Sequence, residues 1–246
     1  MTNQREHEGK VALVLGGSRG IGAAIVERLA ADGAKVAFTY ASSADQAAAL
    51  AARVASSGGE AAAFRADSAD VADVESAFDL TLERFGRLDI VVVNAGILRL
   101  GTIDQISIED FDRIVAVNIR GVFAALRKAA TVLGKGGRIL TIGSNIVDRV
   151  GFPGAGLYAM TKAAVATLVK GAAIDLASRG ITVNNIQPGP IATDMTKEHV
   201  DFILPNVPLG RMGQPQEIAG LTSYLARDEA AFATGASLTM DGGYSV

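Results

Sequence analysis

The sequence predicts an α/β protein with a single-domain Rossmann fold, a doubly wound, seven-stranded parallel sheet flanked by helices on both faces. Three observations support this: a length of 246 residues, an apolar content of 49%, and regular alternation of short β-branched runs with longer segments of helical spacing. That length suits one α/β domain with a sizeable core. Alternating strands and right-handed crossover helices form a doubly wound sheet.

The expected strands are short, and the run 88–93 is almost continuously apolar, as in strands covered on both faces. Strands are expected at residues 10–15, 35–40, 61–65, 90–94, 137–142, 182–187 and 237–240. Helices are expected at residues 21–32, 45–57, 71–85, 107–133, 157–179 and 215–227. Gly33 and Gly180 directly follow two of these helical segments, where glycine commonly ends a helix.

Two segments lie outside this alternation. Residues 1–9 are polar and predict a short surface arm, which leaves 10–246 as the folded domain. The irregular stretch at about 188–213 predicts a substrate loop or lid, because loops of that length in compact domains are usually functional.

Composition excludes several classes of function. The net charge is −3, from 23 basic and 26 acidic residues that are mixed along the chain, so no nucleic-acid surface is expected. There are no cysteines and only two histidines, so we expect neither disulfides nor a metal site. The polar start lacks a signal-peptide pattern and no apolar run suits a bilayer, which favours a cytoplasmic protein without membrane contact.

A glycine-rich loop joins the first expected strand to the first helix. It reads Gly16-Gly17-Ser18-Arg19-Gly20-Ile21-Gly22. Glycines in this setting let backbone N–H groups approach a pyrophosphate at the positive end of a helix. A tight turn without a ligand is one alternative. The other is the G-x-S-x-G nucleophile elbow of hydrolases, for which Ser18 would need a base and only His199 is available.

The end of the second expected strand favours NADP(H) over NAD(H). An NAD site usually has a carboxylate about 20 residues after the glycines. Here Tyr40 is followed by Ala41, Ser42 and Ser43, with no acid before Asp45. Arg19 and the serine hydroxyls would suit a 2′-phosphate.

Polar side chains in the second half of the sequence predict acid–base chemistry. Tyr158 and Lys162 are spaced i and i+4 on one face of an expected helix, where the ammonium, with an oxidised nicotinamide cation in reach, would lower the pKa of the phenol. Ser144 and the Asn94-Ala95-Gly96 segment follow two strands, at the sheet edge where such folds bind ligands. Asn118 lies inside a helix, where asparagine is a mediocre former.

Together these motifs resemble the short-chain dehydrogenase/reductase family, in a form similar to 3-oxoacyl-ACP reductases, from residue 10 to residue 246. The resemblance implies a catalytic set of Asn118, Ser144, Tyr158 and Lys162. It also places Asp67 and Ser68 at the adenine, and the Pro188-Gly189-Pro190-Ile191-Ala192-Thr193 segment at the nicotinamide. The full set expected at the cofactor is Gly16, Ser18, Arg19, Gly20, Ile21, Gly22, Tyr40, Ser42, Ser43, Asp67, Ser68, Asn94, Ala95, Gly96, Tyr158, Lys162, Pro188, Gly189, Ile191 and Thr193.

The resemblance also implies the role of each catalytic residue. Tyr158 would protonate the carbonyl oxygen, Ser144 would hold that oxygen, Lys162 would bind the nicotinamide ribose, and Asn118 would anchor a water chain. Three positions depart from the family pattern: Leu15 replaces a usual threonine, Val93 replaces a frequent asparagine, and one extra residue separates Ser144 from Tyr158.

We therefore expect an NADP(H)-dependent oxidoreductase that interconverts a ketone or aldehyde and an alcohol, with a small-molecule substrate. Family members suggest a homotetramer. The alternative is a nucleotide-binding regulator on the same scaffold, because the sequence is also similar to a subgroup that contains a cyclic di-GMP-binding mediator of biofilm dispersal. In that case Arg99 and Arg149 would meet the second phosphate ligand.

Overall fold

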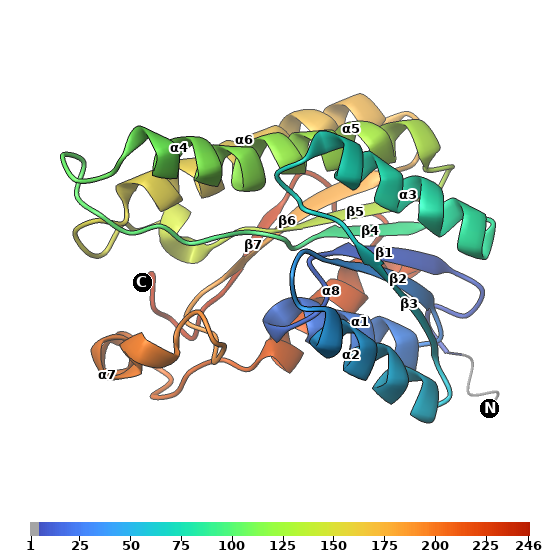
Figure 1. Cartoon of the computed structure of the whole chain (residues 1–246), viewed down its shortest axis with the longest axis horizontal. Helices are drawn as coiled ribbons and strands as arrows, with labels where there is room; N and C mark the ends of the chain where they lie inside the picture. Colours follow the sequence, from blue (N-terminus) through green and yellow to red (C-terminus); the bar gives the residue numbers. More distant parts are fainter. Residues whose placement is uncertain (1–4) are drawn as a thin grey trace.

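Seven parallel strands form one sheet in the order β3-β2-β1-β4-β5-β6-β7 (Figure 1). The structure is a computed structural model that describes residues 5–246. The strands are β1 (Val11–Leu15), β2 (Lys35–Tyr40), β3 (Glu60–Arg65), β4 (Ile90–Val93), β5 (Arg138–Ile142), β6 (Thr182–Pro188) and β7 (Ser237–Met240). The predicted fold is confirmed, and each strand ends within one residue of its expected bounds.

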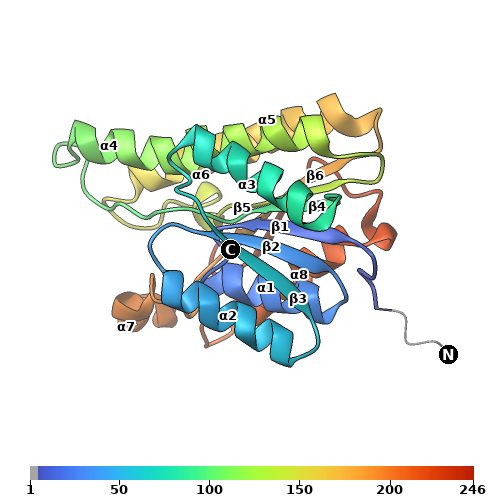
Figure 2. The ribbon, with the colours of Figure 1, turned by 45° about the vertical axis from the view of Figure 1, so that its right-hand side comes forward.

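Helices cover both faces of the sheet, as Figures 1 and 2 show from two directions. One face carries α1 (Gly20–Ala31), α2 (Ala44–Ser56) and α8 (Pro215–Ala226). The other face carries α3 (Val71–Phe85), α4 (Ile108–Val115), α5 (Val122–Val132) and α6 (Gly156–Ala177). The sheet is thus the middle of three layers; β1, β4, β5 and β6 are buried on both sides, whereas the edge strands β3 and β7 are partly exposed.

Strand β1 illustrates why the chain needs both helical layers. Its side chains alternate between the two faces, as the two-residue period of a strand requires. Leu13 and Leu15 belong to the core beneath α3, α5 and α6, whereas Ala12 and Val14 belong to the core beneath α1, α2 and α8. All four are essentially buried, so a solvent-exposed face would cost hydrophobic free energy.

The predicted helix over 107–133 is interrupted in the structure. Helix α4 ends at Val115, a π-helical segment η1 (Ala116–Gly121) follows, and α5 begins at Val122. Gly121 lies against the main chain of the neighbouring layer, since a Cβ there would be 2.0 Å from the Ser68 carbonyl oxygen. Only glycine allows this close approach.

Within the described chain, α6 is long and apolar enough to cross a membrane by length and composition. From the sequence we expected no segment suited to a bilayer. In the structure it packs on the sheet beside β6, and its Val165, Val169 and Leu176 belong to the core. Core helices of this kind satisfy the same criterion.

The amino-terminal segment, expected as a surface arm, is held to the fold by one buried side chain. Residues 1–4 lie outside the described residues, but the side chain of His7 is fully buried, with Nε2 3.1 Å from Ser223 Oγ of α8. Burial is the largest influence on His7 and lowers the pKa of its imidazole. The other residues of the stretch 5–9 are exposed, so it lies on the surface and is anchored to the fold through His7.

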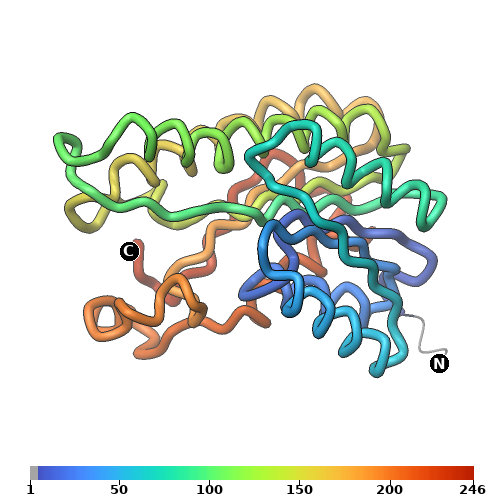
Figure 3. Tube along the Cα trace, viewed as in Figure 1, coloured from blue at the N-terminus to red at the C-terminus, as the bar shows by residue number. Residues whose placement is uncertain are grey.

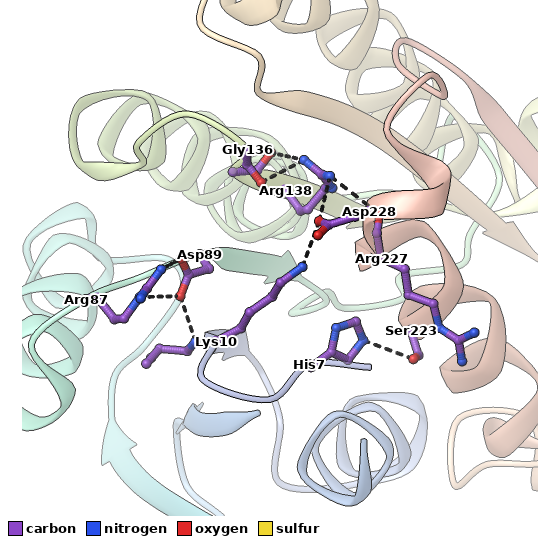
Figure 4. A network of polar contacts seen from close by, with 11 residues as sticks. His7, Lys10, Arg87, Asp89, Gly136, Arg138, Ser223, Arg227 and Asp228 are labelled. Atoms are coloured by element: carbon purple, nitrogen blue, oxygen red, sulfur yellow. Dashed lines mark hydrogen bonds and ion pairs between the residues drawn. The ribbon is translucent and has the colours of Figure 1, made fainter. Parts of the chain in front are cut away.

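A polar network closes the amino end of the sheet around this segment (Figure 4). Arg138 of β5 is 3% exposed and donates to the Gly136 carbonyl at 2.7 Å. Its guanidinium and the Lys10 ammonium share Asp228, at 3.4 and 2.9 Å. A charge this deeply buried requires such partners. The network lies at the opposite end of the strands from the predicted catalytic residues.

The stretch between β6 and α8 forms the predicted irregular loop, here called the lid (residues 189–214). It contains α7 (Val200–Ile203) between two short 3₁₀ turns, which the sequence analysis did not predict. Figure 3 shows the lid standing away from the helical layers, beside the carboxyl-terminal segment.

Candidate active site

The predicted site residues gather at the carboxyl ends of the strands. The glycine loop follows β1, Asn94 follows β4 and Ser144 follows β5. Strands β1 and β4 are neighbours although they are not consecutive in the chain. The strand order reverses direction between them, and ligands of doubly wound sheets bind at such a switch point.

The glycine loop has a shape that other residues would disrupt. Gly16 and Gly20 have φ angles of 75° and 54°, in the left-handed region. A Cβ on Gly22 would lie 2.2 Å from the Gly16 carbonyl oxygen, and that oxygen accepts a hydrogen bond from Asn94 Nδ2 at 2.6 Å. Helix α1 begins directly after Arg19, whose side chain makes no capping bond. The loop therefore fits a dinucleotide phosphate at a helix amino terminus.

A hydroxyl that the sequence analysis missed stabilises the turn. Leu15 stands where the family usually has threonine, so the hydroxyl of that position is missing from the turn. In the structure Thr39 of β2 accepts a hydrogen bond from the Gly16 N–H at 2.9 Å. Thr39 is 1% exposed. The replacement comes from the adjacent strand, which no local motif of the glycine loop could indicate.

The end of the site near β2 and β3 carries the groups expected at the adenosine. Arg19 and Ser42 are exposed, and Ser43 precedes α2 without capping it. Asp67 borders an open hollow of about 450 Å³ and pairs with Arg113 at 3.2 Å. A hydrogen bond from the Ala69 N–H is the largest cause that lowers the Asp67 pKa, so this carboxylate is ionised and held in place.

Asn118 lies in the π-helical segment η1 and is buried. Its Oδ1 accepts from the Ile97 N–H and its Nδ2 donates to the Ile97 carbonyl, both at 2.9 Å. Nδ2 also lies 3.2 Å from Thr161 Oγ1. The side chain therefore ties the segment after β4 to α6. The wider helical turn at this point is typical of functional sites.

Tyr158 and Lys162 share one face of α6, as their spacing predicts. Lys162 Nζ is 5.6 Å from the centroid of the Tyr158 ring and donates to the Ile142 carbonyl at 2.9 Å. Burial raises the pKa of Tyr158 to about 12 and lowers the pKa of Lys162 to about 8. At neutral pH the phenol is thus a protonated acid, and burial opposes the lowering of its pKa that we expect from the ammonium together with an oxidised nicotinamide.

Ser144 reaches Tyr158 despite the extra residue between them. It precedes the 3₁₀ turn η2 (Asn145–Val147), and its hydroxyl accepts from the Ile146 N–H at 3.3 Å. Ser144 lies near enough to Tyr158 to oppose the rise in the Tyr158 pKa that burial causes. Phe152 and Ile146 pack beside Tyr158 and give the site an apolar wall.

The segment after β6 closes the other side of the site. Pro188 ends the strand, and Ile191 is buried and bridges to Gly213 across the base of the lid. Thr193 faces the glycine loop, since a Cβ on Gly20 would lie 3.5 Å from its Cγ2. The structure thus brings the P-G-x-x-x-T segment next to the glycine loop.

The hydrolase alternative lacks its central contact. Among residues 5–246, no hydrogen bond joins Ser18 to His199, which lies exposed in the lid. The serine–histidine pair that does form, Ser223 with His7, lies at the amino end of the sheet.

Two further polar residues at the catalytic end of the sheet were not predicted from the sequence. Thr161 is fully buried and donates to the Tyr158 carbonyl at 2.8 Å, and Gln187 of β6 donates to the Ser144 carbonyl at 3.2 Å.

Known proteins match this chain over nearly its whole length. The family profile described as enoyl-(acyl carrier protein) reductase matches residues 16–245. A cyclic-di-GMP-binding biofilm dispersal mediator protein of Escherichia coli is 44% identical over 239 residues, covering 96% of this chain and 97% of that protein. The 3-oxoacyl-(acyl-carrier-protein) reductase FabG of Escherichia coli is 43% identical over 243 residues, with 96% and 97% coverage.

Solved structures agree with these matches. A short-chain dehydrogenase/reductase from Serratia marcescens is 51% identical with a TM-score of 0.96, covering 98% of this chain and all of that one. A short-chain dehydrogenase from Burkholderia cenocepacia, solved in complex with NADP, is 45% identical with a TM-score of 0.95 and the same coverage. Fold, ordered motifs and relatives lead to one conclusion: the chain belongs to the short-chain dehydrogenase/reductase family of oxidoreductases.

Proposed function

We propose that this protein interconverts a ketone or aldehyde and an alcohol, with NADP(H) as the hydride carrier and Tyr158 as the general acid and base. One observation carries the proposal: the Ser144 hydroxyl, the Tyr158 phenol and the Lys162 ammonium lie together at the end of β5. Two adjacent hydroxyl donors suit an oxygen that gains negative charge. This favours carbonyl reduction over reduction of a carbon–carbon double bond.

The cofactor assignment has support of its own. The glycine loop fits a dinucleotide phosphate, and Arg19, Ser42 and Ser43 offer a cation and hydroxyls where a 2′-phosphate would lie. The Burkholderia cenocepacia relative binds NADP. A nicotinamide dinucleotide bound here supplies a hydride to the carbonyl carbon, or removes one from the alcohol.

The chain's own residues handle the proton. Tyr158 donates its phenolic proton to the carbonyl oxygen, which fits its raised pKa at neutral pH. Ser144 holds the same oxygen by a hydrogen bond. Lys162 is held by the Ile142 carbonyl below the phenol, where its ammonium stabilises the phenolate that remains. The amide of Asn118 is engaged with Ile97, so the water chain implied by the resemblance would start at a backbone carbonyl of η1.

The regulator alternative has less support. Its basis is the Escherichia coli relative described as cyclic-di-GMP-binding. Of the two arginines expected to meet that ligand, Arg99 already pairs with Asp110 at 3.1 Å, and Arg149 is exposed. A purely binding function also leaves the Ser144, Tyr158 and Lys162 arrangement unexplained.

We retain the cytoplasm as the expected compartment and a homotetramer as the expected assembly. Large apolar side chains are exposed on the outer faces of α5 and α6, among them Phe123 at 52% and Ile174 at 79%, and near the end of the chain, where Phe232 is fully exposed. Exposed apolar groups of this size commonly mark subunit contacts. Sedimentation equilibrium measures the assembly directly, and the mass of a single chain would contradict a tetramer.

Replacement of Tyr158 by phenylalanine tests the reaction. We expect kcat for carbonyl reduction to fall by roughly 10²- to 10⁴-fold, because the proton donor is lost. The dissociation constant for NADPH should stay nearly constant. The assay follows NADPH absorbance with ketones, β-ketoesters, aldehydes and an enoyl thioester, with Tyr224→Phe as the matched control on α8. Unchanged kcat in Tyr158→Phe would refute the assigned role, and NADPH binding without turnover of any carbonyl would favour the regulator.

Replacement of Arg19 by alanine tests cofactor preference. Loss of a charge-assisted bond to the 2′-phosphate should lower kcat/KM for NADPH by roughly 10- to 100-fold. The value for NADH should change less than about threefold, since NADH lacks that phosphate. Parallel steady-state titrations with the two cofactors measure the ratio. Equal losses for both would mean that Arg19 supports the loop and does not read the phosphate.

The lowered pKa of Lys162 predicts a pH-dependent stability. In the unfolded chain a lysine titrates near 10.5, whereas in the folded protein Lys162 titrates at about 8. Between these values the unfolded state binds more protons, so the free energy of unfolding rises with pH. The contribution is on the order of 2 kcal/mol between pH 7.5 and 9.5. Urea unfolding at both pH values should show this rise in the native protein and a smaller one in Lys162→Met. An equal rise in the free energy of unfolding of both proteins would contradict the lowered pKa.

A further inference from the structure

The segment Asp241–Ser245, here called the C-terminal turn, follows β7 and contacts three parts of the active site. It reaches the loop that carries Ser144, the segment after β6, and the lid. Figures 1 and 3 show the end of the chain beside the lid. None of its residues belongs to the catalytic or cofactor set described above.

The first contact is with the residue next to the catalytic serine. Asn145 is 8% exposed, and its Nδ2 donates to Asp241 Oδ2 at 3.2 Å and to Ser245 Oγ at 3.0 Å. The carboxylate of Asp241 is itself fixed by N–H groups of Gly243 and Ser245, each at 2.9 Å. Burial opposes ionisation of Asp241, but hydrogen bonds from Ser245, Asn145 and Gly243 bring its pKa below the usual value. An ionised, pre-oriented acceptor therefore holds Asn145.

The second contact is with the segment expected at the nicotinamide. The Gly189 N–H donates to the Met240 carbonyl at 3.0 Å. A Cβ on Gly189 would lie 2.3 Å from the Cβ of Asp241, so the aspartate side chain packs directly on the main chain there. The position of Asp241 and the path of this segment cannot change independently.

The third contact is with the lid. The Leu209 N–H donates to the Gly242 carbonyl at 3.1 Å. Gly242 and Gly243 have φ angles of 65° and 87°, and a Cβ on Gly243 would lie 2.9 Å from Pro208 Cγ. The two left-handed glycines thus let the turn pass close to residues 207–209, at the end of the lid nearest α8.

Strands β6 and β7 supply a second support for the serine loop. Thr239 donates to Asp148 Oδ2 at 3.0 Å, and Gln187 donates to the Ser144 carbonyl at 3.2 Å. These bonds hold the loop at residues 144 and 148, whereas the bonds of Asn145 go to the C-terminal turn. The turn is thus the support that also connects to the lid.

We propose that Asp241 is a positioning residue of the reaction: through Asn145 it fixes the Ser144 hydroxyl relative to Tyr158, and through its turn it couples that geometry to the lid. This rests on the proposed function of the site. Among the described residues, the carboxylate of Asp241 bonds to Asn145, Gly243 and Ser245, and to none of the catalytic residues or the glycine loop. Hydrogen bonds to a developing oxyanion lose their effect when the donor moves by about 1 Å, so loss of the support should slow the chemical step.

Steady-state kinetics of four variants test this. Three single variants break the hydrogen bond between Asn145 and Asp241: Asn145→Ala, Asp241→Ala and Asn145→Asp. The last does so by placing two carboxylates next to each other. The double variant Asn145→Asp with Asp241→Asn restores an amide–carboxylate pair in the reverse direction. We expect kcat to fall roughly 10- to 100-fold in each single variant, with the dissociation constant for NADPH within about threefold of native. The double variant should regain part of kcat, and Asp175→Asn on α6 is the exposed-carboxylate control.

Three results would overturn the proposal. The first is a native kcat in Asp241→Ala. The second is a loss of NADPH affinity and of thermal stability in Asp241→Ala that accompanies the loss of kcat, as expected for general unfolding. The third is a double variant no more active than Asn145→Asp.

Hydrogen–deuterium exchange provides a readout that does not need turnover. In Asp241→Ala, amides of residues 143–148 and 204–210 should exchange faster, while those of β1 and β4 stay protected. Protection unchanged in both segments would contradict the coupling even if no substrate were found. A native protein that binds NADPH but reduces no carbonyl would instead count against the proposed function, so the two failures are distinguishable.

Discussion

The rest of the structure depends on the close approach between the glycine loop and the end of β4. A Cβ on Gly16 would lie 2.8 Å from the Ala95 Cα, and Asn94 reaches the Gly16 carbonyl at 2.6 Å. This contact joins the two halves of the sheet at the point where the strand order reverses. It also directs the amino terminus of α1 toward the site. The glycine loop, where a phosphate is expected, and the catalytic residues therefore lie at the same edge of the sheet.

The sequence was sufficient for the elements and for the place of the site because both depend on local patterns. Strand and helix periodicity, and the order of the motifs, located each strand to within a residue. Contacts between distant segments were not predictable in this way. Thr39 replaces the hydroxyl missing at Leu15 from a different strand, and His7 is buried because α8 happens to cover it. The unusual position of Asn118 was noticed, but the π-helical geometry around it was not predicted.

The electrostatics of the site also needed the structure. The spacing placed an ammonium near a phenol, and that ammonium together with an oxidised nicotinamide suggested a lowered tyrosine pKa. Burial acts on both groups, however, and it favours the neutral form of each. The protein thus holds an uncharged phenol beside a lysine whose charged form is destabilised by burial. A destabilising pair of this kind persists where function requires it.

The bond from Gly16 to Thr39 has a consequence for anyone who redesigns this protein. The strand that ends beside the expected adenosine contacts also shapes the phosphate turn, since Thr39 directly precedes Tyr40 and lies close in sequence to Ser42 and Ser43. Cofactor preference and loop rigidity are therefore not separate design variables. Substitutions at the two serines leave the Thr39 bond in place, whereas a library that varies the strand itself would mix altered recognition with a weakened turn.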